Sequence, residues 1–115
     1  MYIYDKANEL ARMLKQSEQY TTYRELADKI EANETDRTML KEYKKLRFEI
    51  QSMYMAGGEP DQEKLDKLAK LGEVLQFNQE ITRFLSAEYN LNQLMGDIYK
   101  ILGEAVDIDL SFLKD

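Results

Sequence analysis

Basic side chains cluster in the middle of this sequence and are its clearest candidates for binding another molecule. Residues four positions apart share one face of a helix, so the cluster predicts a basic helix face that could bind an anionic partner such as RNA or DNA. The alternative, which we prefer, is a solvated outer face on which Glu42 and Glu49 balance the positive charges. The cluster consists of Arg37, Lys41, Lys44, Lys45 and Arg47.

Acidic side chains offer a second kind of chemistry, because two neighbouring carboxylates can act as general acid and general base. Glu88 stands out among them, since it falls between Phe84 and Leu91 in a series of apolar positions. We interpret Glu88 as a carboxylate at the edge of an apolar stripe that reaches water or a basic partner. The remaining Asp and Glu residues form no recognisable catalytic motif.

The chain contains no histidine and no cysteine. This excludes Ser-His-Asp and Cys-His catalytic arrangements, zinc sites built from Cys or His, cysteine-bound iron–sulfur clusters and the Glu-x-x-His motif of di-iron bundles. Glycine-rich nucleotide-binding motifs are also missing from the sequence. We therefore expect no catalytic residues, no metal and no cofactor, and we do not expect an enzyme.

Composition predicts a protein with one core, since 115 residues are about the length of a single domain. The content of 43% hydrophobic and 33% charged residues is too apolar for a disordered tail. No apolar run approaches the roughly 18 residues that cross a bilayer, and the N-terminus shows no secretory signal, so we expect a cytoplasmic protein without membrane contact. The net charge of −6 repels polyanions, which makes nucleic acid an unfavoured partner.

Apolar periodicity predicts an all-α fold, a bundle of four to five helices with a long antiparallel helical hairpin. Gly57 and Gly58 end the first arm of this hairpin, and Pro60 opens the second. A change of register between Leu75 and Phe77 leaves open whether the fourth and fifth helices are separate or form one bent helix. The chain is expected to be a single helical domain, 1–115, with helices at about 4–16, 17–32, 35–56, 60–75 and 78–105 and a short docked tail at 106–115.

Tyr20 and Tyr23 lie three positions apart in a polar stretch and could form a stacking platform for a ligand or a base. They are also in helical register with Leu26 and Ile30, so their rings can extend a packed face. A platform for nucleic acid needs positive charge around it, and acidic residues outnumber basic ones in this stretch. We therefore predict packing for both tyrosines.

The long segments carry more apolar surface than the short N-terminal helices can cover, which predicts a homo-oligomer, with a two-fold dimer favoured. Tyr54 and Met55 lie at the end of the first hairpin arm, beside Met53. They are candidate interface residues because such side chains are favoured in interface cores. The alternative is that Met53 packs internally while Tyr54 and Met55 only shield the turn.

Three stretches carry a resemblance to a known family: YDKANELARMLKQSEQYTTY, EYKKLRFEIQSMYMAGGEPDQEKLDKLAKL and NQEITRFLSAEYNLNQLMGDIYKIL. In these stretches the chain resembles the YheA/YmcA/YlbF family of small helical bacterial proteins, and most closely its YheA-like branch. The resemblance covers nearly the whole chain and concerns spacing, helix caps and length. No family functional residue carries over to a position of this chain.

The resemblance implies an all-helical cytoplasmic protein without known catalytic activity that associates with itself or with other proteins. Some family members are linked to competence, sporulation and biofilm formation and act with an endoribonuclease in RNA processing. This implies a regulatory or adaptor role with a protein partner in RNA processing or developmental regulation. Certain relatives carry cysteines associated with iron–sulfur binding, and this chain has none, so a cluster-dependent role is not implied.

Overall fold

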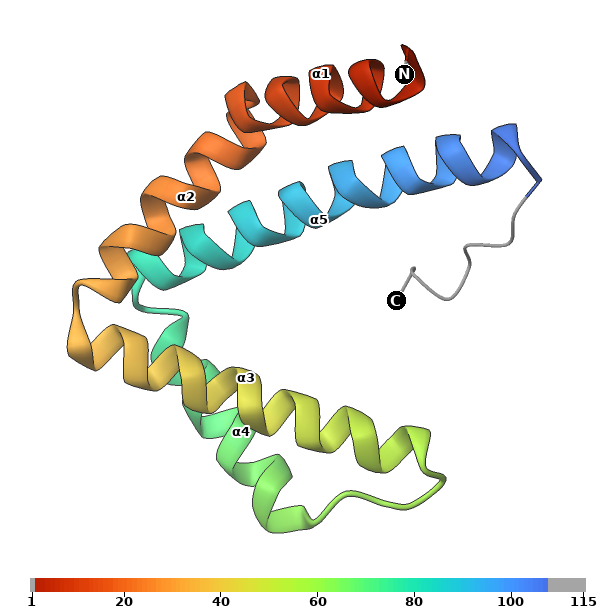
Figure 1. Ribbon diagram of the computed structural model, residues 1–115. Helices are drawn as coiled ribbons and strands as arrows, with labels where there is room; N and C mark the ends of the chain where they lie inside the picture. Colours follow the sequence, from red (N-terminus) through yellow and green to blue (C-terminus); the bar gives the residue numbers. More distant parts are fainter. Residues whose placement is uncertain (1, 108–115) are drawn as a thin grey trace. The chain divides into compact units, whose positions relative to one another are not determined.

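The computed structural model describes residues 2–107, which form five α-helices and the short connections between them (Figure 1). The predicted all-α fold class, with its long antiparallel hairpin, is confirmed. The apolar positions Ile108, Leu110 and Phe112 of the predicted docked tail lie outside the described residues. The helices are α1 (Tyr2–Gln16), α2 (Glu18–Glu31), α3 (Glu34–Met55), α4 (Gln62–Leu75) and α5 (Gln79–Ala105).

Side-chain caps explain where the first helices begin. Ser17 Oγ accepts a hydrogen bond of 3.2 Å from the backbone N–H of Tyr20, which separates α2 from α1. Asn33 Oδ1 accepts a hydrogen bond of 3.1 Å from the backbone N–H of Asp36 and starts α3 in the same way. α1 begins at Tyr2, slightly earlier than its apolar pattern indicates.

The turn of the hairpin depends on Gly57, which has a φ of 84°. Its N–H donates to the carbonyl of Tyr54 at 3.1 Å, and the N–H of Gly58 donates to the carbonyl of Met53 at 3.0 Å. This pair of bonds is the Schellman motif that ends many helices, and only glycine adopts the required left-handed conformation without a steric cost. The glycine pair thus ends α3 as the sequence predicts.

The return arm, α4, begins at Gln62 rather than at residue 60. Asp61 Oδ1 accepts a hydrogen bond of 3.0 Å from the backbone N–H of Glu63, which makes Asp61 the N-cap. α4 and α5 are separate helices, because Asn78 Oδ1 accepts a bond of 3.1 Å from the N–H of Ile81 and caps a new helix. The chain therefore adopts the broken arrangement, one of the two that the sequence left open.

Contacts divide the chain into two compact units. Unit 1 contains residues 2–26 and 84–107 of the described chain, and unit 2 contains residues 27–83. α2 and α5 each contribute residues to both units. No helix among residues 2–107 is both long and apolar enough to span a lipid bilayer.

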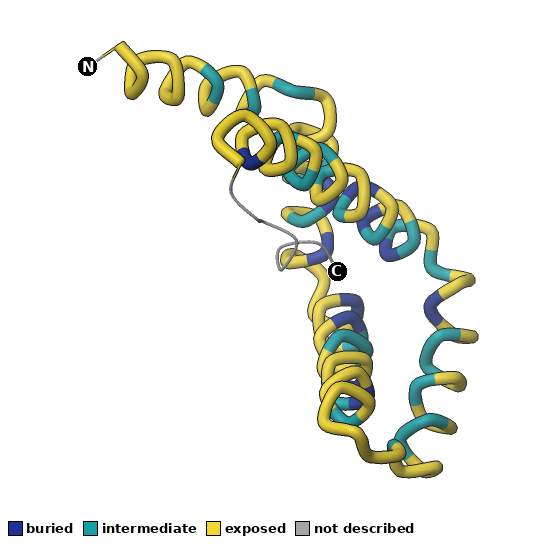
Figure 2. Tube along the Cα trace, turned by 90° about the vertical axis from the view of Figure 1, so that its right-hand side faces the viewer, coloured by how far each residue is buried: buried dark blue, intermediate teal, exposed yellow. Residues whose placement is uncertain are grey.

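Unit 1 has a small core. Leu26, Phe84 and Ala87 are buried, and the Tyr23 ring packs against Phe84 with 5.4 Å between ring centroids. Tyr23 therefore packs as predicted, and its ring is not free to serve as a stacking platform. None of the residues of α1 is buried, and Figure 2 shows this helix exposed over most of its length.

Unit 2 is built around the hairpin of α3 and α4, the two helices in closest contact. Its buried side chains repeat at helical spacing along α3 and reappear at the end of α4 and the start of α5 (Figure 2). These apolar residues come from segments far apart in the sequence, so the core forms only when the hairpin closes. They are Ile30, Leu40, Leu46, Ile50, Leu75 and Ile81.

A polar contact connects two helix starts in unit 2. Asp36, in the first turn of α3, is only 8% exposed. The side-chain amide of Asn78 donates a hydrogen bond of 2.8 Å to Asp36 Oδ1, while Asn78 Oδ1 accepts from the N–H of Ile81. Asn78 therefore satisfies a buried carboxylate and caps α5 at the same time.

Replacing Asn78 with alanine should lower the free energy of unfolding by about 2 kcal/mol, because it removes a helix cap and a donor to the buried Asp36 carboxylate. Urea denaturation followed by circular dichroism measures this difference. Gln79→Ala is the matched control, since it removes an exposed amide one residue further along and should cost less than about 0.5 kcal/mol. Equal losses for the two variants would show that the Asn78 contact does not stabilise the fold.

Candidate functional site

Two of the predicted basic residues of α3, Lys41 and Lys45, border a groove of about 540 Å³ between the two arms of the hairpin. α3 supplies one wall of this groove, and the start of α4 with its N-cap supplies the other. Four lysines and four carboxylates line it, so positive and negative charges balance. They are Lys41, Lys45, Lys64 and Lys67 with Glu42, Glu49, Asp61 and Glu63.

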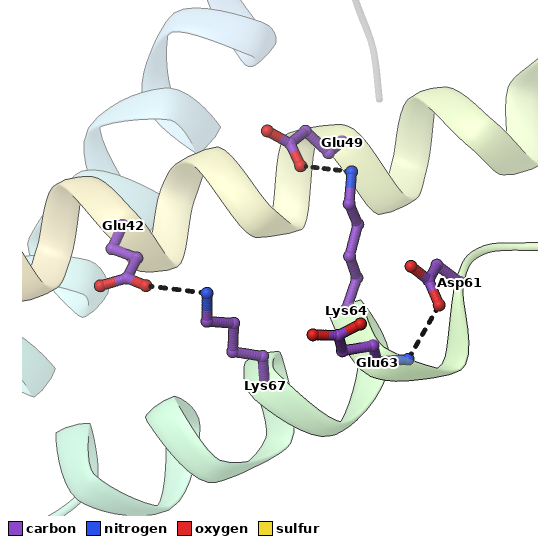
Figure 3. Close-up of polar contacts among 6 residues, drawn as sticks. All are labelled: Glu42, Glu49, Asp61, Glu63, Lys64 and Lys67. Carbon is purple, nitrogen blue, oxygen red and sulfur yellow. Dashed lines mark hydrogen bonds and ion pairs between the residues drawn. The ribbon is translucent and has the colours of Figure 1, made fainter.

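Two ion pairs cross the groove and join the arms of the hairpin (Figure 3). Lys64 Nζ lies 2.9 Å from Glu49 Oε2, and Lys67 Nζ lies 3.8 Å from Glu42 Oε1. Both lysines come from α4 and both glutamates from α3, so each pair contributes to the register of the two helices. The preferred interpretation of Glu42 and Glu49 as residues that balance positive charge agrees with this geometry, although their partners are on the other helix.

The Glu49–Lys64 pair changes the acidity of both groups. The hydrogen bond from Lys64 lowers the pKa of Glu49, and the charges of Lys64, Lys45 and Lys67 add to this effect against a desolvation cost. The same hydrogen bond raises the pKa of Lys64. Lys45 therefore has a nearby negative charge in Glu49, which weakens the predicted basic face as an open anion site.

The structure separates the other predicted basic residues. Arg37 lies at the start of α3, where its guanidinium donates to the backbone carbonyl of Glu31 at 3.1 Å and forms an ion pair with the Glu31 carboxylate at 3.9 Å. Lys44 is half-buried, and Arg47 lies over the Tyr43 ring at 5.5 Å from its centroid. Only Lys41 and Lys45 of the predicted set line the groove.

The sequence analysis did not identify Phe48 as a candidate contact residue, although it is 70% exposed in the structure. It lies three residues after Lys45 and seven before Met55, positions that share one face of a helix. The signal was available, because Phe48 falls outside the apolar stripe of α3 that contains Leu46 and Ile50. An aromatic residue opposite the buried side of a helix indicates a contact surface.

Tyr54 and Met55 lie at the end of α3, where they are 59% and 87% exposed. Neither residue lines the groove, so the structure does not join them with the basic residues in one site. Met53 is half-buried, in agreement with an internal position for that side chain. The exposed residues Phe48, Tyr54 and Met55 define what we call the hairpin-end surface.

Unit 1 carries a second groove, of about 420 Å³, between α2 and α5. Its lining is mixed, with the polar side chains of Glu18, Gln19, Asn90, Gln93 and Asp97 beside the apolar side chains of Ala87 and Leu94. Within residues 2–107, no three acidic side chains gather in a way that could hold a metal ion. Glu88 is half-buried, as its position at the edge of the apolar stripe predicts.

Replacing Glu49 with glutamine should lower stability at neutral pH and leave it nearly unchanged at acid pH. A carboxyl whose pKa is lowered by folding stabilises the fold fully above its ordinary pKa, and this contribution disappears as the pH falls through the lowered value. The pKa of Lys64 is raised by folding, so the Lys64 contribution to stability is fully present at any pH below the ordinary lysine pKa. This contribution is lost only as the pH rises through the raised pKa.

Thermal denaturation from neutral to acid pH measures the prediction. Glu59→Gln, which removes the same charge from the connection between α3 and α4, is the control and should give a smaller difference from the unmodified protein. A Glu49→Gln difference that stayed constant below the ordinary carboxyl pKa would contradict the assigned pair.

Comparison with known proteins gives a family match over residues 3–107, to the model described as control of competence regulator ComK, YlbF/YmcA. Among individual relatives, a UPF0342 protein of Symbiobacterium thermophilum is 38% identical over 112 residues, which cover 97% of this chain and 100% of that protein. A UPF0342 protein of Clostridium tetani is also 38% identical over 112 residues, covering 97% of each chain.

Two solved structures share the fold. One is a protein of unknown function (DUF964) from Bacillus stearothermophilus, with a TM-score of 0.75, 14% identity and coverage of 93% of this chain and 94% of that one. The other is Bacillus subtilis RicA in complex with RicF, with a TM-score of 0.63, 23% identity and coverage of 92% and 94%. At these identities the likeness concerns the fold alone. The family match and the relatives, by contrast, span nearly the whole chain, and the protein belongs to the YlbF/YmcA family.

Proposed function

We propose that this chain is a non-enzymatic cytoplasmic regulatory protein that acts by binding proteins, both a second copy of itself and a different protein partner. The observation that carries the proposal is the number of large apolar side chains exposed on a small helical protein. Contiguous exposed apolar surface on such a protein is typical of an interaction site.

The family supports a role in regulation, since its description names the control of a competence regulator. A protein of the same fold, RicA, has been solved in complex with another protein, RicF. We extend this mode of action to the present chain and propose a partner that acts in developmental regulation or RNA processing. Tyr54 and Met55 of the hairpin-end surface are the proposed contacts, because exposed aromatic and methionine side chains are favoured in interface cores.

Light scattering at micromolar concentration tests self-association. We expect a mass near twice 13.6 kDa, because burial of the exposed apolar side chains against a second copy is favourable. A mass that stays at 13.6 kDa across the concentration range would contradict this part of the proposal.

Affinity purification at native expression, with gentle crosslinking, tests the heterologous partner. The double variant Tyr54→Glu/Met55→Glu should recover less of that partner than the unmodified chain, while helical circular dichroism remains unchanged. The double variant Gln76→Glu/Gln79→Glu adds the same two negative charges at exposed positions where α4 ends and α5 begins, and is the control. Recovery of this chain alone, from both preparations, would remove the partner from the proposal.

RNA binding is the second candidate function, and one observation favours it. Lys41 and Lys45 are exposed on α3, and Phe48 is exposed close to Lys45 on the same helix, a combination that can contact phosphates and stack on a base. The acidic net charge and the ion pairs across the groove oppose it. Protein binding is therefore the preferred function.

A fluorescent single-stranded RNA oligonucleotide, titrated at low and rising salt, tests this second candidate. If α3 binds RNA, the slope of log affinity against log salt should fall by about 0.7 for each contacting lysine that is replaced, as in Lys41→Gln and Lys45→Gln. Lys70→Gln on α4, which does not line the groove, should leave the slope unchanged. No binding at low salt would eliminate the candidate.

A further inference from the structure

The N-terminal half of α1 has an apolar face that its own unit does not cover. Leu10 and Leu14 share this face and are half-buried, whereas Ile3, on the same face, is 72% exposed. Cover therefore decreases toward the N-terminus, which Figure 2 shows as a helix that is exposed over most of its length. α1 is amphipathic in sequence but remains without a packing partner along this stretch.

The apolar face of α5 also becomes more exposed toward the end of the chain, here the C-terminal end of the helix. Leu94 and Ile98 are half-buried, while Ile101 is exposed and Leu102 is 53% exposed. At the spacing of an α-helix these four residues lie on one side of α5. The apolar stripe of α5 thus continues past the last residues that pack against the rest of unit 1.

The two uncovered faces belong to the same end of unit 1. Glu18, the first residue of α2, and Asp97 of α5 line the same groove. α1 extends from this groove toward the N-terminus and the end of α5 extends from it toward the C-terminus, both away from the Tyr23–Phe84 contact. Figure 1 shows both segments leaving in the same general direction.

We propose that a second copy of this chain covers both faces. In this dimer, α1 of each copy packs on the C-terminal end of α5 of the other copy. This inference rests on the proposed self-association and assigns a surface to it. A two-fold axis repeats each contact, so one arrangement covers both faces in both copies and leaves no open end. The hairpin-end surface belongs to unit 2 and takes no part in this contact.

α1 and the end of α5 expose eight large apolar side chains, three of them tyrosines. A standard interface buries about 800 Å² per partner and one buried aromatic side chain contributes about 150 to 250 Å², so the members of this set that lie on the two faces contribute part of the apolar area that a dimer needs. Homodimer interfaces are also the more apolar ones. The eight are Tyr2, Ile3, Tyr4, Met13, Tyr99, Ile101, Leu102 and Val106.

The charges around the two faces are complementary. α1 carries three basic residues against two acidic ones. The stretch 97–107 has the opposite excess, with Asp97, Glu104 and Asp107 against Lys100. Contact between α1 and the end of α5 of another copy therefore brings opposite charges together, whereas contact between two α5 ends would bring like charges together.

Ile3→Glu and Leu102→Glu, made separately, test the surface by sedimentation equilibrium. Each should raise the dimer dissociation constant by about 30-fold or more, since it places a charge on an apolar face that the second copy covers. Gln16→Glu, on the opposite side of α1, and Tyr54→Glu, on the hairpin-end surface, are the controls and should leave the constant within about twofold. Circular dichroism confirms that each variant keeps its helices.

Crosslinking gives a second, independent measurement, because the chain has no cysteine of its own. A chain with Ile3→Cys mixed with a chain with Leu102→Cys should form the mixed disulfide under mild oxidation. Formation of only the two symmetric disulfides would overturn the reciprocal arrangement of α1 on α5.

The outcomes separate this inference from the proposed function. A wild-type dimer that resists Ile3→Glu and Leu102→Glu but dissociates with Tyr54→Glu would overturn the surface and leave self-association intact. A wild-type monomer at every concentration would remove self-association itself. A monomer that dimerises only after residues 108–115 are deleted would show that the tail, and not a second copy, covers the faces.

Discussion

The hydrogen bond from Asn78 to Asp36 is the contact on which the hairpin unit depends. It joins the first turn of α3 to the cap of α5, although the two residues are 42 positions apart in the sequence. Asp36 is a buried carboxylate, and burial without a donor would be costly, so the chain must bring Asn78 to this place. Once it does, α4 has to end before Asn78, and the apolar residues at the end of α4 and the start of α5 reach the core. A single amide therefore caps α5 and links it to the first turn of α3, at the break between α4 and α5.

Much of the fold was readable from local chemistry. The repeats of apolar residues and the glycine turn at Gly57 and Gly58 depend on residues a few positions apart, so sequence patterns contain them. The break between α4 and α5 was not decided by those patterns, because it depends on the Asn78–Asp36 contact between distant segments. The start of α4 was placed too early because Pro60 suits a first helical turn, whereas Asp61 provides the stronger signal as a cap.

The candidate sites were less predictable, because a surface depends on which helices meet and in what register. The basic spacing of α3 was visible, but the lysines that pair with Glu42 and Glu49 come from α4, and no pattern within α3 shows that they arrive there. The sequence indicated excess apolar surface and assigned it to Tyr54 and Met55. It did not identify α1, because an amphipathic stripe looks the same whether or not a partner covers it. Exposure in the folded unit distinguishes the two cases, and only the structure provides it.

The lack of buried residues on α1 has a consequence for how this segment folds. An isolated helix of about 15 residues is only marginally stable in water, since the cost of nucleation is barely repaid over so few turns. α1 has 15 residues, none of them buried, so packing within unit 1 stabilises its helix little. Its helix–coil equilibrium is therefore linked to the binding of any molecule that covers its apolar face. In the proposed dimer, helix formation in α1 and association with the second copy are one coupled equilibrium, so the helical content of α1 would rise with protein concentration. The proposed dimer would thus make the folding of α1 depend on the concentration of the protein itself.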